Sequence, residues 1–274
     1  MQTPSPQAPI GIFDSGVGGL SVLRAIRAQL PNENLLYFAD QIHVPYGPRS
    51  LEEVRQFSEA ITRYLLEQGS KLIVVACNTA SAAALHYLRE TFPDVPFVGM
   101  EPAVKPAAEH TSSGVVGVLE TPATFQGALY ASVVERFANG VTVLQNTCVG
   151  LVEEIERGAV DGDKAKEILE SALRPMLGRG LDTVVLGCTH YPFAIPQIEA
   201  ICGDSVRVID PAPAVARQVE RRLAALGILS SGNAQDNVTL YTSGDPEKLQ
   251  SLLPHLCTQI YPVEHAKWEN KKLK

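Results

Sequence analysis

The sequence predicts an α/β protein built from open parallel sheets, and three patterns support this prediction. Short apolar runs rich in β-branched residues recur along the chain, as expected of strands buried on both faces. Amphipathic stretches of helical period separate these runs, and such alternation implies parallel strands joined by right-handed crossovers. A weak internal repeat indicates two related halves, and 274 residues suit two domains of ordinary size.

The first half of the chain alternates strand and helix as far as residue 99. Strands are expected at residues 10–13, 35–39, 71–76 and 95–99. Helices are expected from residue 20 to Pro31, from residue 50 through Leu65, and after Cys77 to about Glu90. Ser50 and Glu53 have capping-box spacing, which predicts where the second helix begins. The loop before it, residues 41–49, is a run of turn formers around one aromatic side chain.

The alternation restarts after Pro93 and continues to the last third of the chain. Strands are expected at residues 115–119, 142–145, 183–187, 206–209 and 238–242. Helical pattern covers residues 102–110, 151–157, 163–177, 196–201 and 210–226, with further helices from Thr121-Pro122 and from Pro246. The basic segment 267–274 is expected to be solvated.

Composition excludes several classes of protein. A hydrophobic content of 45% with 19% charged residues is typical of a globular chain, and no apolar run approaches the roughly 20 residues that cross a bilayer. The first nine residues have neither the basic start nor the apolar centre of a signal peptide. Five irregularly spaced cysteines favour a reducing cytoplasm over a disulfide framework. The net charge of −7 disfavours non-specific nucleic-acid binding.

Two cysteines stand where buried strands end. Cys77 follows the strand at residues 71–76 and is followed by Asn78 and Thr79, whereas Cys188 follows the strand at 183–187. Ligands of open α/β sheets bind at the carboxyl ends of strands. A single buried Cys usually acts as a small hydrophobe. Core packing gives no reason for two matched thiols each followed by hydrogen-bonding side chains, so the pattern favours a functional site.

The repeat connects the two thiols. Residues 11–15 resemble residues 117–121, which lie 106 positions later, and Cys188 follows Cys77 by 111 positions. The similar offsets indicate two related α/β halves that each lend one thiol to a shared cleft.

Three other chemistries fit the sequence less well. The Gly-rich run 16–19 lacks the third Gly of a dinucleotide fingerprint, since Ser21 stands in its place. Cys188 and His190 have no further compact set of ligands that would complete a zinc site. A cysteine hydrolase could pair Cys188 with His190, but it would leave Cys77 without a role. Two thiols across a cleft suit inversion at carbon, because one can remove a proton while the other delivers one.

Four motifs resemble glutamate racemase, a family of the aspartate/glutamate racemase superfamily. They are Phe13-Asp14-Ser15-Gly16-Val17-Gly18-Gly19, Pro45-Tyr46-Gly47, Ala76-Cys77-Asn78-Thr79-Ala80 and Gly187-Cys188-Thr189-His190-Tyr191-Pro192. The resemblance implies a cofactor-independent isomerase that interconverts L- and D-glutamate in the cytoplasm and supplies D-glutamate for peptidoglycan, and so for cell-wall biogenesis and cell shape. No Lys occurs in the four motifs to hold pyridoxal phosphate as a Schiff base.

The resemblance also implies a role for each site residue. Cys77, helped by Asp14, takes the proton of D-glutamate, and Cys188, helped by His190, takes that of L-glutamate. The residues expected to hold the substrate are Asp14, Ser15, Tyr46, Gly47, Asn78, Thr79, Thr121, Thr124, Thr189 and His190, and no metal ligands are expected. The turn formers around Tyr46 separately predict that Tyr46 and Gly47 lie in a loop that lines the cleft rather than in the core, with an ordinary surface loop as the alternative. Glu153 is a further acidic candidate, and Glu120 stands where a small residue is expected.

The family fold implies a first domain of residues 1–98 and 210–274 around Cys77, and a second of residues 99–209 around Cys188. The expected partner is glutamate, not nucleic acid or membrane, and a homodimer stays open. Two rival functions remain. One is racemisation of aspartate or a hydantoin, and the other is binding of an amino acid between two lobes without turnover.

Overall fold

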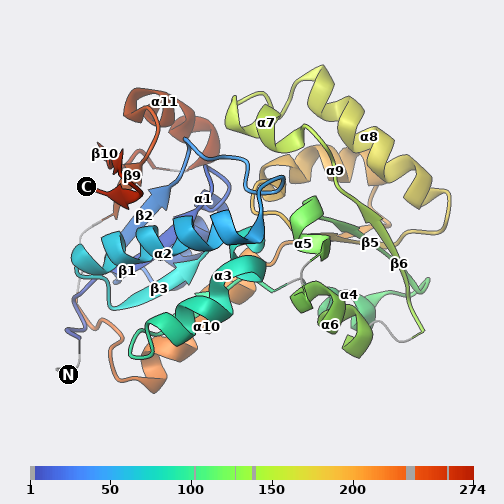
Figure 1. Ribbon diagram of the computed structural model, residues 1–274. Coiled ribbons are helices and arrows are strands. Elements are labelled where there is room, and N and C mark those ends of the chain that lie inside the picture. The colour runs from blue at the N-terminus through green and yellow to red at the C-terminus, as the bar shows by residue number, and fades with distance from the viewer. Residues whose placement is uncertain (1–3, 102, 127, 138–139, 233–237, 258) are drawn as a thin grey trace. The chain divides into compact units, whose positions relative to one another are not determined.

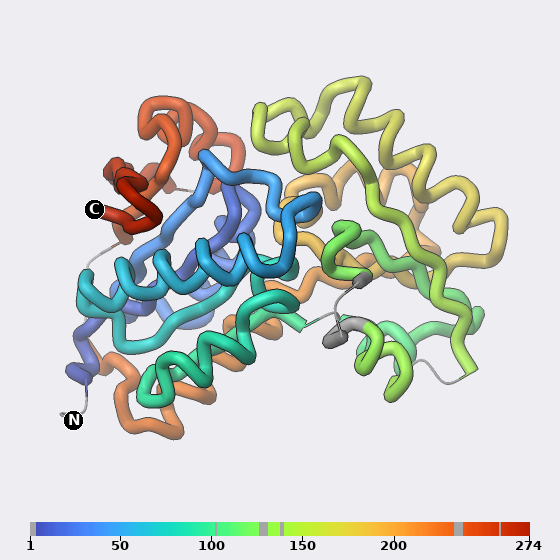
Figure 2. Tube along the Cα trace, viewed as in Figure 1, coloured from blue at the N-terminus to red at the C-terminus, as the bar shows by residue number. Residues whose placement is uncertain are grey.

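The computed structural model describes residues 4–101, 103–126, 128–137, 140–232, 238–257 and 259–274 (Figure 1). The chain divides into two compact units. The first unit comprises residues 1–100 and 212–274, and the second comprises residues 101–211. The sequence predicted boundaries after residues 98 and 209. Figure 2 shows how the last part of the chain, in red, returns to the first unit beside the blue N-terminal strands.

The first unit is built on a six-stranded parallel sheet in the order β10-β9-β2-β1-β3-β4. Its strands are β1 (Ile10–Asp14), β2 (Leu35–Ala39), β3 (Leu72–Val75), β4 (Phe97–Gly99), β9 (Val238–Thr242) and β10 (Val263–His265). Its helices are α1 (Leu20–Gln29), α2 (Leu51–Glu67), α3 (Asn78–Thr91), α10 (Ala212–Ala225) and α11 (Pro246–Leu256). Helix α1 packs on α10, and α2 packs on α3.

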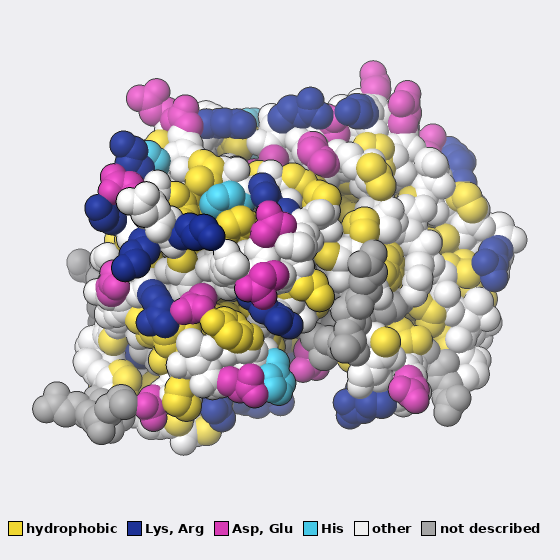
Figure 3. All heavy atoms as spheres, in the orientation of Figure 1, with side chains coloured by type: hydrophobic (Ala, Val, Ile, Leu, Met, Phe, Trp, Pro, Cys, Tyr) yellow, Lys and Arg dark blue, Asp and Glu magenta, His cyan; other side chains and the backbone are white. Residues whose placement is uncertain are grey.

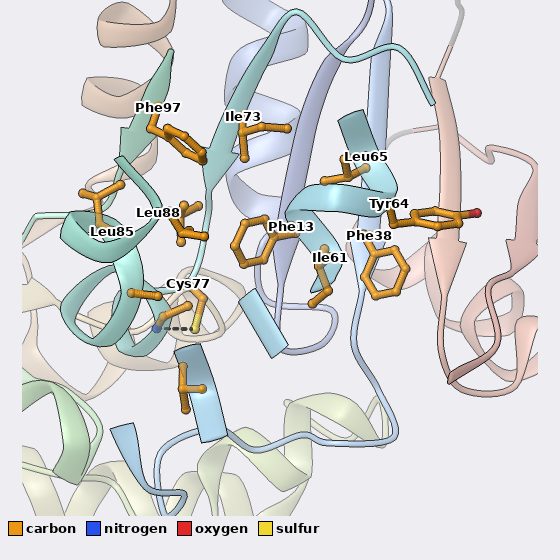
Figure 4. Close-up of a cluster of buried hydrophobic side chains, with 14 of the residues drawn as sticks. Phe13, Phe38, Ile61, Tyr64, Leu65, Ile73, Cys77, Leu85, Leu88 and Phe97 are labelled. Atoms are coloured by element: carbon orange, nitrogen blue, oxygen red, sulfur yellow. Dashed lines mark hydrogen bonds between the residues drawn. The ribbon is translucent and has the colours of Figure 1, made fainter. Parts of the chain in front are cut away.

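Strands β1 and β3 are buried at every residue, which explains why their sequences are apolar without alternation. Their side chains join those of α2 and α3 in a cluster that includes Phe13, Ile61, Ile73 and Leu88 (Figure 4). Burying each such side chain contributes about 1.5–3 kcal/mol. Cys77 belongs to the same cluster, so the core of the first unit holds this thiol in place.

The second unit has a four-stranded parallel sheet in the order β6-β5-β7-β8. Its strands are β5 (Val115–Leu119), β6 (Thr142–Asn146), β7 (Thr183–Leu186) and β8 (Arg207–Ile209). Its helices are α4 (Val104–His110), α5 (Pro122–Gln126), α6 (Ala128–Phe137), α7 (Leu151–Glu156), α8 (Asp163–Leu177), a 3-10 turn (Tyr191–Ala194) and α9 (Ile195–Cys202). Pro102, where the sequence predicted that α4 begins, lies outside the described residues.

The two sheets share one topology. The order β2-β1-β3-β4 in the first unit matches β6-β5-β7-β8 in the second, and each first strand has its second on one side and its third on the other. This common order supports the repeat inferred from the sequence. All these strands are parallel, but the direction in which successive strands are added to the sheet reverses between β1 and β3, and again between β5 and β7. Such switch points open a crevice at the carboxyl ends of the strands, where α/β proteins bind ligands.

The segment 267–274 is not a solvated tail, so that expectation was wrong. Strands β11 (Trp268–Glu269) and β12 (Lys272–Leu273) form an antiparallel hairpin, and Leu273 is buried in the core of the first unit. Asn270 and Lys271 make the turn with φ of 49° and 64°. Gly usually marks such a turn, so the sequence carried no hairpin signal here.

On the face drawn in Figure 3, Lys and Arg side chains are interspersed with Asp and Glu. Within the described part of the chain, no helix combines the length and apolarity that spanning a bilayer requires.

Candidate active site

Asp14 ends β1 at the switch point of the first unit and is fully buried. Its Oδ2 atom accepts hydrogen bonds from the backbone N–H groups of Gly16 (3.2 Å) and Gly19 (3.0 Å), so the carboxylate fixes the turn that leads into α1. A Cβ on Gly19 would lie 2.7 Å from that of Asp14, which explains why glycine is needed there. Ser15, next in the chain, is also buried.

Cys77 follows β3, on the other side of the same switch point. It is the N-cap of α3, and its Sγ accepts a hydrogen bond from the N–H of Ala80 at 3.4 Å. The positive end of the helix therefore favours the thiolate. Asn78 and Thr79 begin the helix and are buried, and neither the amide oxygen nor the amide nitrogen of Asn78 has a hydrogen-bond partner among the described residues. Unpartnered amides are rare in a native protein and indicate a missing ligand or water.

Tyr46 lies in the loop after β2, as expected, but its ring lies in the core. The side chain is 1% exposed and belongs to the same hydrophobic cluster as Cys77. The expectation that it lies outside the core was wrong for the ring, because its hydroxyl finds a buried acceptor in Asp40 at 2.6 Å. Burial raises the pKa of Tyr46 well above its usual value, and the negative charges of Asp40, Cys77 and Asp14 raise it further. Gly47 is buried beside it.

In the second unit, Cys188 and His190 follow β7 at the equivalent switch point. Cys188 Sγ lies 3.8 Å from His190 Nδ1, and His190 Nε2 lies 2.7 Å from an oxygen of Glu156 on α7. All three side chains are buried, and Thr189 between the first two is buried as well. A thiol, an imidazole and a carboxylate thus form one chain of hydrogen bonds.

Burial lowers the pKa of His190, but the hydrogen bonds with Cys188 and Glu156 outweigh burial and hold this pKa well above its ordinary value. The imidazole of His190 thus stands between a thiol and a carboxylate, and its hydrogen bonds with both favour its charged form. The sequence did not single out Glu156. It pointed instead to Glu153, which is exposed on the same helix. The two residues are three positions apart, and only the packing of α7 decides which one reaches His190.

Thr121 and Thr124 follow β5, and their hydroxyl oxygens lie 2.9 Å apart where α5 begins. Glu120, just before them, is fully buried, and neither of its carboxyl oxygens has a hydrogen-bond partner among the described residues. Burial raises the pKa of Glu120 to about 9. Its side chain fills the space over Gly187, where a Cβ would lie 1.9 Å from Glu120 Cγ.

The remaining three cysteines are poorly suited to proton transfer. Burial raises the pKa of Cys148 to about 12, that of Cys257 to about 11, and that of Cys202 above its ordinary value. Cys77 and Cys188 are the two thiols that stand at switch points with a helix N-terminus or an imidazole beside them. Among the described residues, no group of three or more His, Cys, Asp or Glu side chains is arranged to hold a metal ion.

Residues 10–219 match the family model Asp/Glu/Hydantoin racemase. The chain belongs to this family. It is an amino-acid racemase, an isomerase. A glutamate racemase of Roseiflexus sp. (strain RS-1) is 51% identical over 259 residues, which are 94% of this chain and 95% of that protein.

Two crystal structures are similar to the racemase in fold as well. Escherichia coli glutamate racemase in complex with L-glutamate and the activator UDP-MurNAc-ala has a TM-score of 0.83 and 34% identity, covering 94% of this chain and 98% of its own. Francisella tularensis glutamate racemase in complex with D-glutamate has a TM-score of 0.81 and 30% identity, covering 95% and 97%.

Proposed function

We propose that this racemase interconverts L- and D-glutamate in the cytoplasm by a two-base mechanism that needs no cofactor, and that it supplies D-glutamate for peptidoglycan. The observation that carries the proposal is the pair of thiols, Cys77 and Cys188, at equivalent switch points of two units with the same strand order. Related proteins of E. coli and F. tularensis have been crystallised with the two glutamate enantiomers, which supports the choice of substrate.

Cys188 acts on L-glutamate. Its thiolate removes the proton from Cα, and the imidazolium of His190 balances the thiolate charge before this step. Glu156 holds that imidazolium from its other nitrogen. When the reaction runs from D-glutamate, Cys188 is the thiol that delivers a proton to Cα.

Cys77 acts on D-glutamate in the same way. The N–H of Ala80 stabilises its thiolate at the start of α3. Asp14 is the proton relay on this side, next to the Gly-rich turn that its carboxylate holds. The carbanion formed at Cα is flanked by one thiol on each face, so protonation from the opposite side inverts the configuration.

The substrate is held by short polar groups at the strand ends. Asn78 is a strong candidate, because its buried amide lacks a partner among the described residues. Ser15, Thr79, Thr189 and the Thr121–Thr124 pair supply hydroxyls, and the backbone of Tyr46 and Gly47 supplies the loop contact. Since the ring of Tyr46 lies in the core, its side chain anchors the loop instead of touching glutamate.

The proposal is tested by incubating the purified chain with L- or D-glutamate in D2O. We expect deuterium at Cα together with loss of optical rotation, in the absence of pyridoxal phosphate and with carbonyl reagents present. A binding protein would give neither signal. Faster exchange with aspartate than with glutamate would favour an aspartate racemase, and dependence on an added cofactor would contradict the mechanism.

A second prediction concerns Glu156. Glu156→Gln removes the negative partner of His190, so the imidazolium is less stable and the Cys188 thiolate is less populated. We expect kcat/KM to fall about 10- to 100-fold, which is the range typical of a carboxylate that orients a functional histidine. It should fall equally for both enantiomers, because their equilibrium constant is one. Steady-state kinetics on each enantiomer measure this, and Glu153→Gln is the matched variant on the same helix. A larger loss in Glu153→Gln would transfer the role to that residue.

A further inference from the structure

The hairpin of residues 266–274 is fastened to the first unit by its backbone and by two side chains. The N–H of Ala266 donates to the carbonyl of Thr242 at the end of β9, and Lys267 and Lys274 exchange two backbone hydrogen bonds at 2.9 and 3.0 Å. Leu273 is buried in the core cluster, and Trp268 packs against the same cluster. The hairpin is therefore part of the first unit and not an appendage.

Trp268 donates a hydrogen bond to a carboxylate that also binds the loop of residues 41–49, which contains Tyr46 and Gly47. Asp40 directly follows β2 and is fully buried. Its Oδ1 atom accepts from Trp268 Nε1 and from Ser243 Oγ, both at 2.8 Å. Its Oδ2 atom accepts from Tyr46 Oη at 2.6 Å and from His43 Nδ1 at 2.9 Å. One oxygen thus binds the hairpin and the residue that follows β9, and the other binds the loop of residues 41–49.

Trp268 also touches the loop directly. Its ring meets that of His43 edge-on at 5.1 Å, and His43 stacks at 4.0 Å on Phe57 of α2. Arg49, at the far end of the loop, donates to the carbonyl of His43 at 2.5 Å and lies 5.5 Å from the Phe57 ring. Edge-on and stacked ring pairs have preferred geometries, so moving Trp268 would displace His43 and with it both ends of the loop.

We propose that Trp268 is a positioning residue for substrate binding, which acts by holding Asp40 and His43 so that the Tyr46-Gly47 backbone stands ready for glutamate. This inference rests on the proposed function, in which that backbone contacts the substrate. A hydrogen bond to a carboxylate is stronger than one between neutral groups. A buried carboxylate that loses a donor is destabilised, so its position and those of its remaining partners should shift. Binding of the substrate to the loop should therefore change the surroundings of the Trp268 ring.

Trp268 is the single tryptophan of the chain, so its fluorescence reports on this connection without labelling. Titrating the wild-type protein with racemic glutamate should change the emission of Trp268 saturably, with a midpoint close to KM. Trp268→Phe supplies the tyrosine background. Unchanged emission at saturating glutamate, in protein that turns glutamate over, would overturn the proposal. This readout does not depend on any variant folding.

Kinetics supply the second readout. Trp268→Phe keeps an aromatic ring but removes the donor to Asp40, and we expect KM to rise about five- to tenfold while kcat stays within twofold. Glu269→Gln is the matched control, because it breaks only the exposed ion pair with Lys274 in the same hairpin and should leave KM unchanged. A loss of thermal stability with KM unchanged in Trp268→Phe would show a purely structural hairpin.

Tyr46→Phe tests whether the effect passes through Asp40. It removes one of the two donors that the loop provides to this carboxylate, the other being His43, so it should raise KM as well. The double variant should raise KM by less than the product of the two single effects. Fully multiplicative effects would overturn the shared role of Asp40. If the wild-type protein gives no turnover of glutamate, both the proposed function and this inference fail, whereas normal wild-type turnover with unchanged Trp268→Phe kinetics overturns this inference alone.

Discussion

Replacing Cys77 by Ser should abolish racemisation in both directions and yet leave one half of the chemistry intact. A Ser hydroxyl is far less acidic than a thiol and is a poor base near neutral pH. We expect kcat to fall at least about 1,000-fold, at the upper part of the range for loss of a general base. The change in volume is small, so the buried cluster around Cys77 should survive it.

The surviving half-reaction is visible with a glutamate analogue that carries chloride at Cβ. Removal of the Cα proton by a thiolate expels chloride, and the resulting enamine hydrolyses to a 2-oxo acid and ammonia. Cys77→Ser should still eliminate chloride from the L-analogue, using Cys188, and fail on the D-analogue. Cys188→Ser should show the opposite preference. Chloride release and 2-oxo-acid formation measure both.

Each unit offers a matched control for these variants. Cys257→Ser in the first unit and Cys202→Ser in the second remove thiols whose pKa burial raises, and both should racemise normally. Equal loss of elimination on both analogues in folded Cys77→Ser and Cys188→Ser would contradict the assignment of one thiol to each face. A single-nucleophile mechanism using Cys188 and His190 would then fit better.

The sequence predicted the parts of this protein that depend on local pattern. Buried parallel strands are apolar throughout, so the strands and the two thiols at their ends could be located from hydrophobic runs alone. The similar spacing of residues 11–15 and 117–121 anticipated the shared strand order of the two sheets. The residue that directly follows a strand can be located from local sequence alone, without knowledge of the strand order.

Interactions between distant elements escaped the sequence. Glu156 reaches His190 across 34 positions, and helical spacing alone cannot choose between it and Glu153. Trp268 reaches Asp40 across 228 positions from a hairpin with no turn signal. The turn formers around Tyr46 predicted the loop correctly. They gave no indication that the hydroxyl of Tyr46 donates to the buried carboxylate of Asp40. In each case tertiary packing, and not local preference, decides the partner.

The titration of Glu120 should have a large effect on stability. It is buried without a hydrogen-bond partner among the described residues, and its pKa in the folded protein is about 9, against about 4.3 for an unperturbed Glu. Between these two values the folded state holds a proton that the unfolded state releases. The free energy of unfolding should therefore decrease as pH rises through this window, by up to about 1.4 kcal/mol per pH unit from this group.

Glu120→Gln keeps the shape and removes the titration, so its stability should match the wild type near pH 5 and exceed it by a few kcal/mol at pH 8. Denaturant unfolding at pH 5, 6.5 and 8, followed by circular dichroism, measures the difference, with Glu199→Gln as the matched exposed control in the second unit. The control should follow the wild type at every pH. Parallel pH profiles for wild type and Glu120→Gln would mean that Glu120 is ionised in the folded protein, with its carboxylate solvated or paired over Gly187.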